Sequence, residues 1–221
     1  MLVDRQFPRE NVERLLYFCS PLLLLAVCIP AQYVSGPLLG RWAWVPTMLL
    51  FWATITAIII WLKGRSAFRD WLQPSQASVL WPVLAVIAGL FSLPGFILHW
   101  QLILEPAVFI AWLSFGLINP WFEEAYWRGL LIDSTKAWGG ILSVIYSSVW
   151  FALSHPLIWG IHTRIMCEWP VIIGLLFVGL IWGTVYYRSR SIRWTIIGHM
   201  LANLLGMAAV ILLNLYDPLA R

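Results

Sequence analysis

Charged residues are scarce in this sequence. Aspartate, glutamate, lysine and arginine make up only 11% of the 221 residues, whereas hydrophobic residues make up 61%. A soluble globular domain carries about a quarter charged residues, so this chain has too little charge to cover a water-facing surface of its size. The composition therefore argues against a soluble enzyme, a disordered protein and a nucleic-acid-binding module. The net charge of +4 is spread along the loops and forms no basic patch of the kind that nucleic acid requires.

Cysteine is scarce as well. The three cysteines, Cys19, Cys28 and Cys167, are an odd number and lie in apolar surroundings. Neither a CxxC pair nor a Cys/His spacing typical of metal sites is present, so the sequence indicates neither a disulfide framework nor a cysteine-based metal centre.

What the sequence does contain is long apolar runs. A helix needs about 20 residues to cross the hydrocarbon layer of a membrane, and most of the uncharged runs reach that length. These runs cover 15–40, 42–62, 71–104, 106–122, 137–163, 169–187 and 194–216. Since helices satisfy their own backbone hydrogen bonds in lipid, we predict an all-α, polytopic integral membrane bundle with about 7–8 transmembrane helices.

The expected spans can be placed along the chain. They lie near 15–33, 43–62, 79–98, 102–118, 120–136, 139–157, 170–187 and 192–214. Residues 63–78 form a polar linker at a membrane surface, and the sequence has no internal repeat. We expect a single membrane domain over residues 1–221.

Basic residues suggest an orientation, because cytoplasmic loops carry an excess of lysine and arginine. The N-terminus and the 63–78 linker are both basic, which places them in the cytoplasm of a bacterial plasma (inner) membrane. Arg188, Arg190 and Arg193 also favour the cytoplasm, and eight full crossings would put them outside. We therefore expect that one segment between 102 and 136 does not cross fully, or that a long helix is broken at Asn119-Pro120.

A few ionisable and amide side chains interrupt the apolar spans. Such groups are costly in a membrane and are functional candidates by default. They form three groups, Glu123-Glu124-x-x-x-Arg128, Phe151-x-x-x-His155 and His199-x-x-x-Asn203. Helical spacing of four residues puts Glu124 beside Arg128 as an ion pair and His199 on the same face as Asn203. Glu123 is rotated by about 100° from Glu124, so the same arginine does not neutralise it.

Helix lengths allow two of these groups to meet. If 120–136 and 139–157 form an antiparallel hairpin, Glu123 and His155 both lie roughly 20–25 Å from its turn. The carboxylate and the imidazole then face each other across the hairpin. Each group alone has a structural alternative, because a Glu–Arg pair can hold a bundle together and a histidine can be satisfied inside it. The three groups together favour a functional site.

The three motifs resemble the signatures of the CPBP (CAAX protease and bacteriocin-processing) family, which includes the type II CAAX prenyl endopeptidases and is also called the ABI family. The order of the motifs and their internal spacing match. The resemblance covers a signature-bearing core at about 100–214, while residues 1–99 are similar only in supplying additional N-terminal spans.

The resemblance implies an intramembrane endopeptidase. By that analogy Glu123 and His155 activate a water molecule, His199 and Asn203 stabilise the oxyanion, and Glu124 and Arg128 support the site. An unneutralised carboxylate beside an imidazole is also a plausible general-base pair on its own chemistry, and two polar groups on one helix face are plausible oxyanion donors.

A metal is the open alternative to this mechanism. Glu123, His155 and His199 could ligate zinc, and members of the family were long described as metalloproteases. The HExxH motif is missing, however, and the glutamate–histidine arrangement can work without metal, so we favour no cofactor.

The leading hypothesis is a protease that hydrolyses a peptide bond of a membrane-associated substrate, such as a pheromone, a bacteriocin leader or a sorting tail. The expected partners are membrane lipids and this peptide or protein substrate, without nucleic acid; the oligomeric state stays open. The alternative is a non-catalytic membrane scaffold or immunity-type protein with the same fold. A small transporter is a third hypothesis, but such proteins show two similar halves with broken helices.

Overall fold

A computed structural model describes residues 7–75 and 77–215, with side chains from Leu15 onward, and helices are the regular secondary structure of this part of the chain. The predicted all-α membrane bundle is confirmed. The helices are α1 (Phe7–Leu39), α2 (Trp44–Lys63), α3 (Ala67–Trp71), α4 (Leu80–Leu90), α5 (Leu93–His99), α6 (Pro106–Glu124), α7 (Asp133–Thr135), α8 (Gly140–Ile158), α9 (Trp169–Ser189), α10 (Arg193–Leu205) and α11 (Ala208–Leu212).

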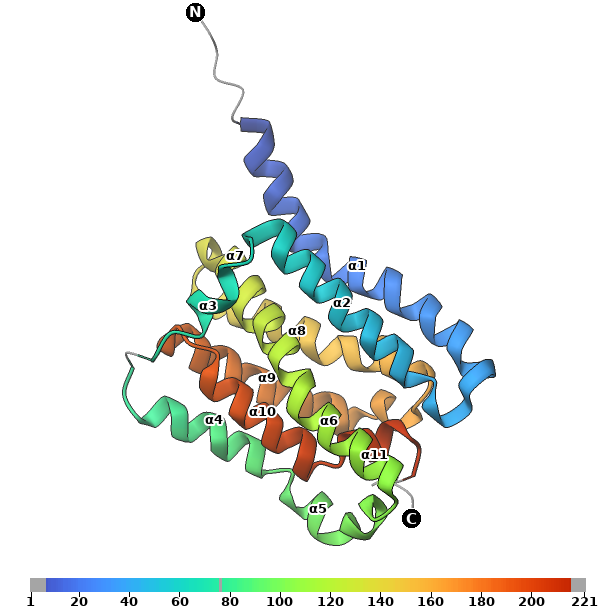
Figure 1. Ribbon diagram of the computed structural model, residues 1–221. Coiled ribbons are helices and arrows are strands. Elements are labelled where there is room, and N and C mark those ends of the chain that lie inside the picture. The colour runs from blue at the N-terminus through green and yellow to red at the C-terminus, as the bar shows by residue number, and fades with distance from the viewer. Residues whose placement is uncertain (1–6, 76, 216–221) are drawn as a thin grey trace, which may run out of the picture.

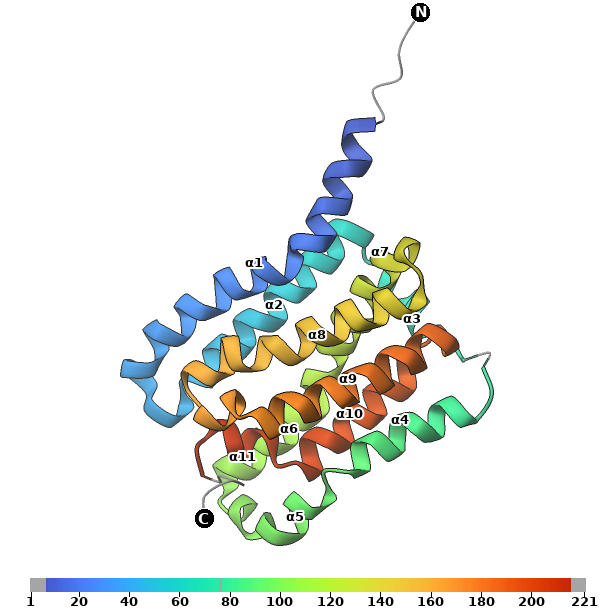
Figure 2. The same ribbon diagram turned by 180° about the vertical axis from the view of Figure 1, so that it is seen from behind.

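The first two helices form a hairpin along one side of the bundle (Figures 1 and 2). A 3₁₀ turn at Gly40–Trp42 joins them, and the Ser35 hydroxyl donates to the carbonyl of Ala43 at 2.8 Å. The hairpin is tied to the rest of the bundle by Tyr146 of α8, whose hydroxyl donates to the carbonyl of Phe18 at 2.6 Å. The α1–α2 hairpin therefore packs against the region that carries the motifs.

The two spans expected at 102–118 and 120–136 are one continuous helical run. It starts at Pro106, passes through Pro120, turns π-helical over Ala125–Ile132 and ends in α7. The expected break at Asn119-Pro120 is therefore wrong. Proline is tolerated inside a helix of a membrane bundle because neighbouring helices and local π adjustments satisfy the freed backbone groups.

Helix α10 packs closely against α4, and both contribute glycine at the contact. A Cβ placed on Gly198 would overlap the carbonyl of Ala85, and one placed on Gly89 would overlap the carbonyl of Gly198. Small residues let helix backbones approach in this way within membranes. The contact matters for the site because Gly198 immediately precedes His199.

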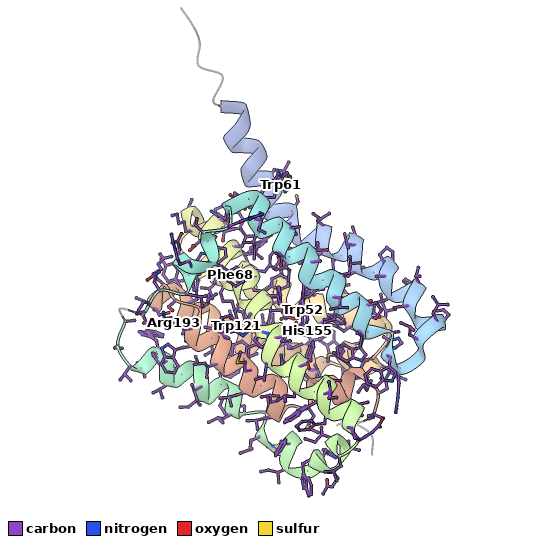
Figure 3. All side chains as sticks on the ribbon, viewed as in Figure 1. Trp52, Trp61, Phe68, Trp121, His155 and Arg193 are labelled. Atoms are coloured by element: carbon purple, nitrogen blue, oxygen red, sulfur yellow. The ribbon has the colours of Figure 1, made fainter. Side chains whose placement is uncertain are left out.

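The connections gather at two ends of the bundle. At the first, which we call the basic end, α3 meets α7 and the α9–α10 loop: Trp71 Nε1 donates to Asp133 at 3.0 Å, and the Ile192 amide donates to the Trp71 carbonyl at 3.0 Å. At the opposite end, His162 Nε2 lies 2.9 Å from the Gly40 carbonyl oxygen. The side-chain amide of Asn214 donates to the His162 carbonyl at 3.2 Å. Figure 3 places Arg193 at the basic end and His155 nearer the middle.

Within the described residues, five helices are long and apolar enough to cross a membrane by length and composition, fewer than the seven or eight predicted. They are Leu15–Trp42, Trp44–Lys63, Leu80–Ile103, Gly140–Ile161 and Trp169–Ser189. The difference lies in α6 and α10, which carry the first and third motifs: α6 ends in two glutamates and α10 has only 13 residues. The polar site therefore lies inside a bundle whose other helices are apolar.

Candidate active site

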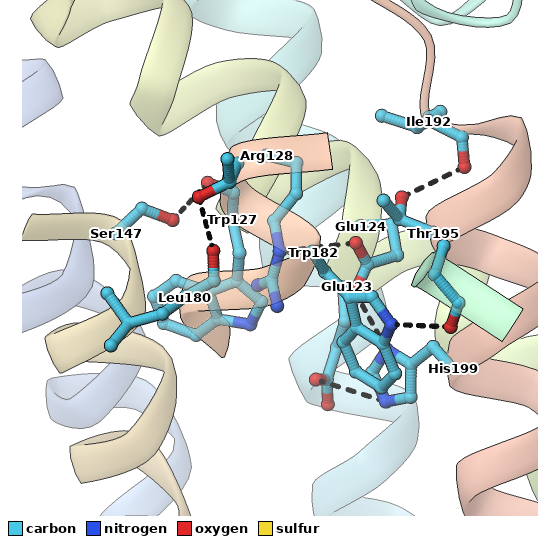
Figure 4. A network of polar contacts seen from close by, with 12 residues as sticks. Glu123, Glu124, Trp127, Arg128, Ser147, Leu180, Trp182, Ile192, Thr195 and His199 are labelled. Carbon is cyan, nitrogen blue, oxygen red and sulfur yellow. Dashed lines mark hydrogen bonds and ion pairs between the residues drawn. The ribbon is translucent and has the colours of Figure 1, made fainter. Parts of the chain in front are cut away.

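The first and third motifs meet through a buried ion cluster. The Glu124 carboxylate lies 2.8 Å from His199 Nδ1 through Oε1 and 3.2 Å from Arg128 Nε through Oε2 (Figure 4). The predicted Glu124–Arg128 pair is thus present, and both side chains are fully buried. The bond from Glu124 to His199 was not predicted: it links the helix of the glutamates to α10 and fixes one nitrogen of the imidazole.

The Arg128 guanidinium is enclosed by aromatic rings. Its central carbon lies 4.5 Å from the ring centre of Phe151 and 5.8 Å from that of Trp182. Contacts of this kind with ring faces stabilise a desolvated cation. The cation thus contacts two aromatic rings as well as the Glu124 carboxylate, and its charge is balanced inside the bundle without exposure.

Glu123 is held from its own helix and from α2. Asn119, one helical turn earlier, donates to Glu123 Oε1 at 3.0 Å, and Trp52 Nε1 donates to the Asn119 side-chain oxygen at 2.9 Å. The second oxygen, Oε2, is buried without a hydrogen-bond partner among the described residues and lies 3.9 Å from His199 Nε2. One carboxylate oxygen is therefore positioned while the other stays available.

His155 is oriented by its own helix. Its Nδ1 lies 2.8 Å from the carbonyl oxygen of Phe151. A carbonyl only accepts, so Nδ1 carries the proton and Nε2 of the neutral ring is an acceptor. The hydrogen bonds of Glu123 and His155 in the described structure go to Asn119, Phe151 and Ser154, so no hydrogen bond joins the carboxylate and the imidazole there.

His155, His199 and Asn203 line one cavity of about 400 Å³. Most of its wall is apolar and comes from α4, α9 and α11. The Asn203 side-chain nitrogen is buried without a hydrogen-bond partner in the described structure. A donor and an acceptor of two motifs thus face a space large enough for part of a peptide chain.

The imidazole of His199 is also fixed by stacking. The Trp182 ring lies nearly parallel to it, with ring centres 4.8 Å apart and planes at 21°. Trp182 is itself anchored, since its Nε1 donates to the Ala85 carbonyl at 3.1 Å. The sequence analysis missed this residue and Trp52, because tryptophans are frequent throughout the chain. Asn119 could have been found, since it precedes Glu123 by four residues.

The described residues contain no group of three His, Cys, Asp or Glu side chains that could hold a metal ion. His199 already directs Nδ1 at Glu124, and His155 directs Nδ1 at a backbone carbonyl. These bonds leave Nε2 of both rings available, and metal-ligating histidines are oriented in the same way, so zinc ligation by Glu123, His155 and His199 stays a prediction.

Comparison with known proteins bears on the motif-bearing region. Residues 105–205 match the family model of the type II CAAX prenyl endopeptidases of the Rce1-like group, and this range includes all three motifs. No curated protein and no solved structure matched the chain. The family is one of proteases, so its match supports a CAAX-protease-type role, and the apolar helices support an integral membrane protein. The resemblance that the motifs indicated, to the CPBP family of intramembrane endopeptidases, is thus confirmed over the segment that builds the buried site.

Proposed function

We propose that the protein hydrolyses a peptide bond of a membrane-associated substrate with water activated by Glu123 and His155. The observation that carries this proposal is the Glu123 oxygen without a hydrogen-bond partner, 3.9 Å from His199 and held in a bundle whose cavity is lined by His155, His199 and Asn203. A structural carboxylate in a membrane is expected to have its oxygens paired, whereas a general base needs one oxygen available.

The charges of the cluster support a role for His199. Two carboxylates, Glu123 and Glu124, and one guanidinium, Arg128, leave one negative charge in a buried site. His199 Nδ1 faces the Glu124 carboxylate at 2.8 Å, so the role proposed for this ring needs a second proton on Nε2. Nε2–H is then a donor beside the Glu123 carboxylate and can stabilise a developing oxyanion together with the Asn203 amide.

The hydrolytic step balances with these groups. The water oxygen attacks the carbonyl carbon while Glu123 Oε2 takes its proton, and His155 Nε2 accepts the second water hydrogen as a hydrogen bond that orients the attack. The carbonyl oxygen becomes an oxyanion that accepts from His199 and Asn203. When the C–N bond breaks, the leaving nitrogen takes the proton from Glu123, which restores the carboxylate.

The proposal also covers the residues that support the site and the location of the protein in the membrane. Glu124 and Arg128 hold His199 in position, and no cofactor is needed for the step as written. We propose that the chain is a single membrane domain in a bacterial inner membrane with a cytoplasmic N-terminus, in contact with lipids and a peptide or protein substrate.

The test compares cells that contain wild-type protein or Glu123→Gln, by proteomics of their membrane and secreted fractions. We expect at least one membrane-associated protein to accumulate uncleaved in the variant while the variant is still inserted at the wild-type level. Glu168→Gln is the matched control, because Glu168 is a partly exposed glutamate paired with Arg164 at the opposite end. Unchanged cleavage products with a well-inserted Glu123→Gln protein would favour the non-catalytic scaffold.

A further inference from the structure

The two ends of the bundle differ sharply in charge. Lysine and arginine gather at the basic end, where the acidic partners are Asp70 and Asp133. The basic side chains there are Lys63, Arg65, Arg69, Lys136, Arg188, Arg190 and Arg193. At the opposite end, Arg41 pairs with Glu105 at 3.6 Å and Arg164 pairs with Glu168 at 3.9 Å, so the described loops there carry no excess charge.

The structure brings the basic loops of the sequence together at one end. Because 106–135 is one helical run, the loops that follow α2, α7 and α9 lie at the same end, and the conflict in the loop charges disappears. Loops rich in lysine and arginine stay on the cytoplasmic side. The basic end therefore faces the cytoplasm and the opposite end faces away from it.

The catalytic cavity lies toward the opposite end. Its lining residues on α9 are Val171, Gly174, Leu175, Phe177, Val178 and Trp182, and all except Trp182 belong to the half of α9 that starts at the opposite end. Met166 and, on α11, Ala208 and Ile211 line it toward the same end. Seen from the basic end, it lies beyond the Glu124–Arg128–His199 cluster.

A side wall of the cavity is exposed on the apolar flank of the bundle. Phe91, directly after α4, and Phe177 of α9 both line it, and their side chains are exposed by 64% and 54%. Their rings lie 6.5 Å apart between the two helices. Exposed aromatic rings on the flank of an apolar cavity suit an apolar substrate segment that arrives through lipid.

We propose that the cavity is filled from the non-cytoplasmic leaflet, and that its substrate is a peptide whose apolar segment reaches the site from that leaflet. This inference rests on the proposed function for its substrate, but the direction of opening is independent of catalysis. It restricts substrates to membrane-anchored or exported polypeptides with the cleaved bond beyond the cytoplasmic half of the membrane.

A native cysteine allows the direction to be measured. Cys167 is exposed at the opposite end and follows Met166 of the cavity wall, whereas Ser78 is exposed in the linker that precedes α4 at the basic end. Two variants each keep a single cysteine, and both carry Cys19→Ala and Cys28→Ala. The first keeps Cys167, and the second carries Cys167→Ala together with Ser78→Cys. Both are treated in spheroplasts with a membrane-impermeant maleimide, before and after permeabilisation.

We expect Cys167 to react before permeabilisation and Ser78→Cys only after it. The reverse pattern, or equal reaction of both positions before permeabilisation, overturns the proposal. The same labelling is done in the Glu123→Gln background, so an inactive or non-catalytic protein still reports its orientation. Failure of the proteolysis test and failure of the opening direction are thereby distinguished.

The path of the substrate has its own test. Gly174 lines the cavity and a Cβ there meets nothing within 4 Å, so Gly174→Leu adds a large side chain to the cavity wall. We expect the substrate found by proteomics to accumulate at least tenfold relative to wild type, with unchanged thermal stability. Gly36→Leu on α1, where a Cβ also meets nothing within 4 Å, is the matched control. Normal cleavage by Gly174→Leu would show that the substrate does not occupy this cavity.

Discussion

At the scale of single residues, the available carboxylate depends on a chain of two hydrogen bonds that starts outside the motifs. Trp52 on α2 donates to Asn119, and Asn119 donates to Glu123. The chain holds one Glu123 oxygen, so that the other oxygen is directed toward His199. Asn119 and Trp52 are therefore positioning residues for the proposed base.

Asn119→Leu should lower the turnover number by about tenfold to a hundredfold and leave the Michaelis constant close to wild type. The change leaves Glu123 Oε1 unpaired, and displaced catalytic groups lose rate in the chemical step. The measurement is steady-state cleavage of the substrate found by proteomics. Trp52→Phe keeps an aromatic ring against Phe122 and removes the hydrogen bond to Asn119, so its effect should be smaller. An equal loss of turnover in both variants would mean that the two hydrogen bonds do not act through Glu123.

The buried ion pair should matter for stability as well as activity. Glu124→Gln or Arg128→Met leaves one buried charge without its partner, which costs about 3–5 kcal/mol in proteins generally. Thermal unfolding in detergent should show a clear drop for each single variant and a smaller loss for the double variant than the two single losses added. Arg164 and Glu168 form a more exposed pair of the same spacing, and their replacement should change stability by less than about 1 kcal/mol. Single variants that melt like wild type would remove the structural role.

The proposed oxyanion donor has a kinetic signature of its own. Asn203→Ala should reduce the turnover number by about a hundredfold to a thousandfold, as loss of one such donor typically does, with little change in the Michaelis constant. The buried side-chain nitrogen has no hydrogen-bond partner in the described structure, so its removal breaks no internal bond. A loss confined to the Michaelis constant would assign Asn203 to substrate binding.

At the scale of helices, the sequence predicts side-chain pairs better than boundaries. The spacing of four residues placed Glu124 beside Arg128 correctly, because that geometry is local. The expected break at Asn119-Pro120 failed, since proline alone does not decide whether a helix in a packed bundle continues. The hydrogen bond between Glu124 and His199 joins two residues that are 75 positions apart in the sequence. No local sequence pattern predicts such a contact.

The contact between α4 and α10 can be tested at this scale. Gly198→Ala puts a methyl group against the Ala85 carbonyl, so α10 must shift and carry His199 away from Glu124 and Trp182. We expect a lower unfolding temperature and a strong loss of cleavage. Gly36→Ala adds the same methyl group where nothing lies within 4 Å and should behave like wild type. Wild-type cleavage by Gly198→Ala would mean that the close approach does not position the site.

At the scale of the whole molecule, the motifs indicated the family and the all-α class, but they left the N-terminal spans without a role. The match to the family model begins at residue 105, so the helices before it lie outside the match. The structure gives the preceding helices specific work: α2 supplies Trp52 to the Glu123 chain, and the Ser20 hydroxyl of α1 bonds the Tyr126 hydroxyl at 2.8 Å. Both contacts join segments far apart in sequence, which is why composition could predict the spans and not their function.

These contacts predict how the chain responds when it is divided in the linker between α3 and α4. Residues 77–221 expressed alone should fail to cleave the substrate and should unfold at a lower temperature, because Asn119 and Tyr126 lose their partners. Coexpression with residues 1–75 as a separate polypeptide should restore both properties, and the two pieces should copurify from detergent, because the hairpin packs on the core through side chains and not through the linker. A fragment of residues 77–221 that is as active and as stable as the full chain would show that the first helices are a separate unit, and that the single membrane domain proposed for residues 1–221 is wrong.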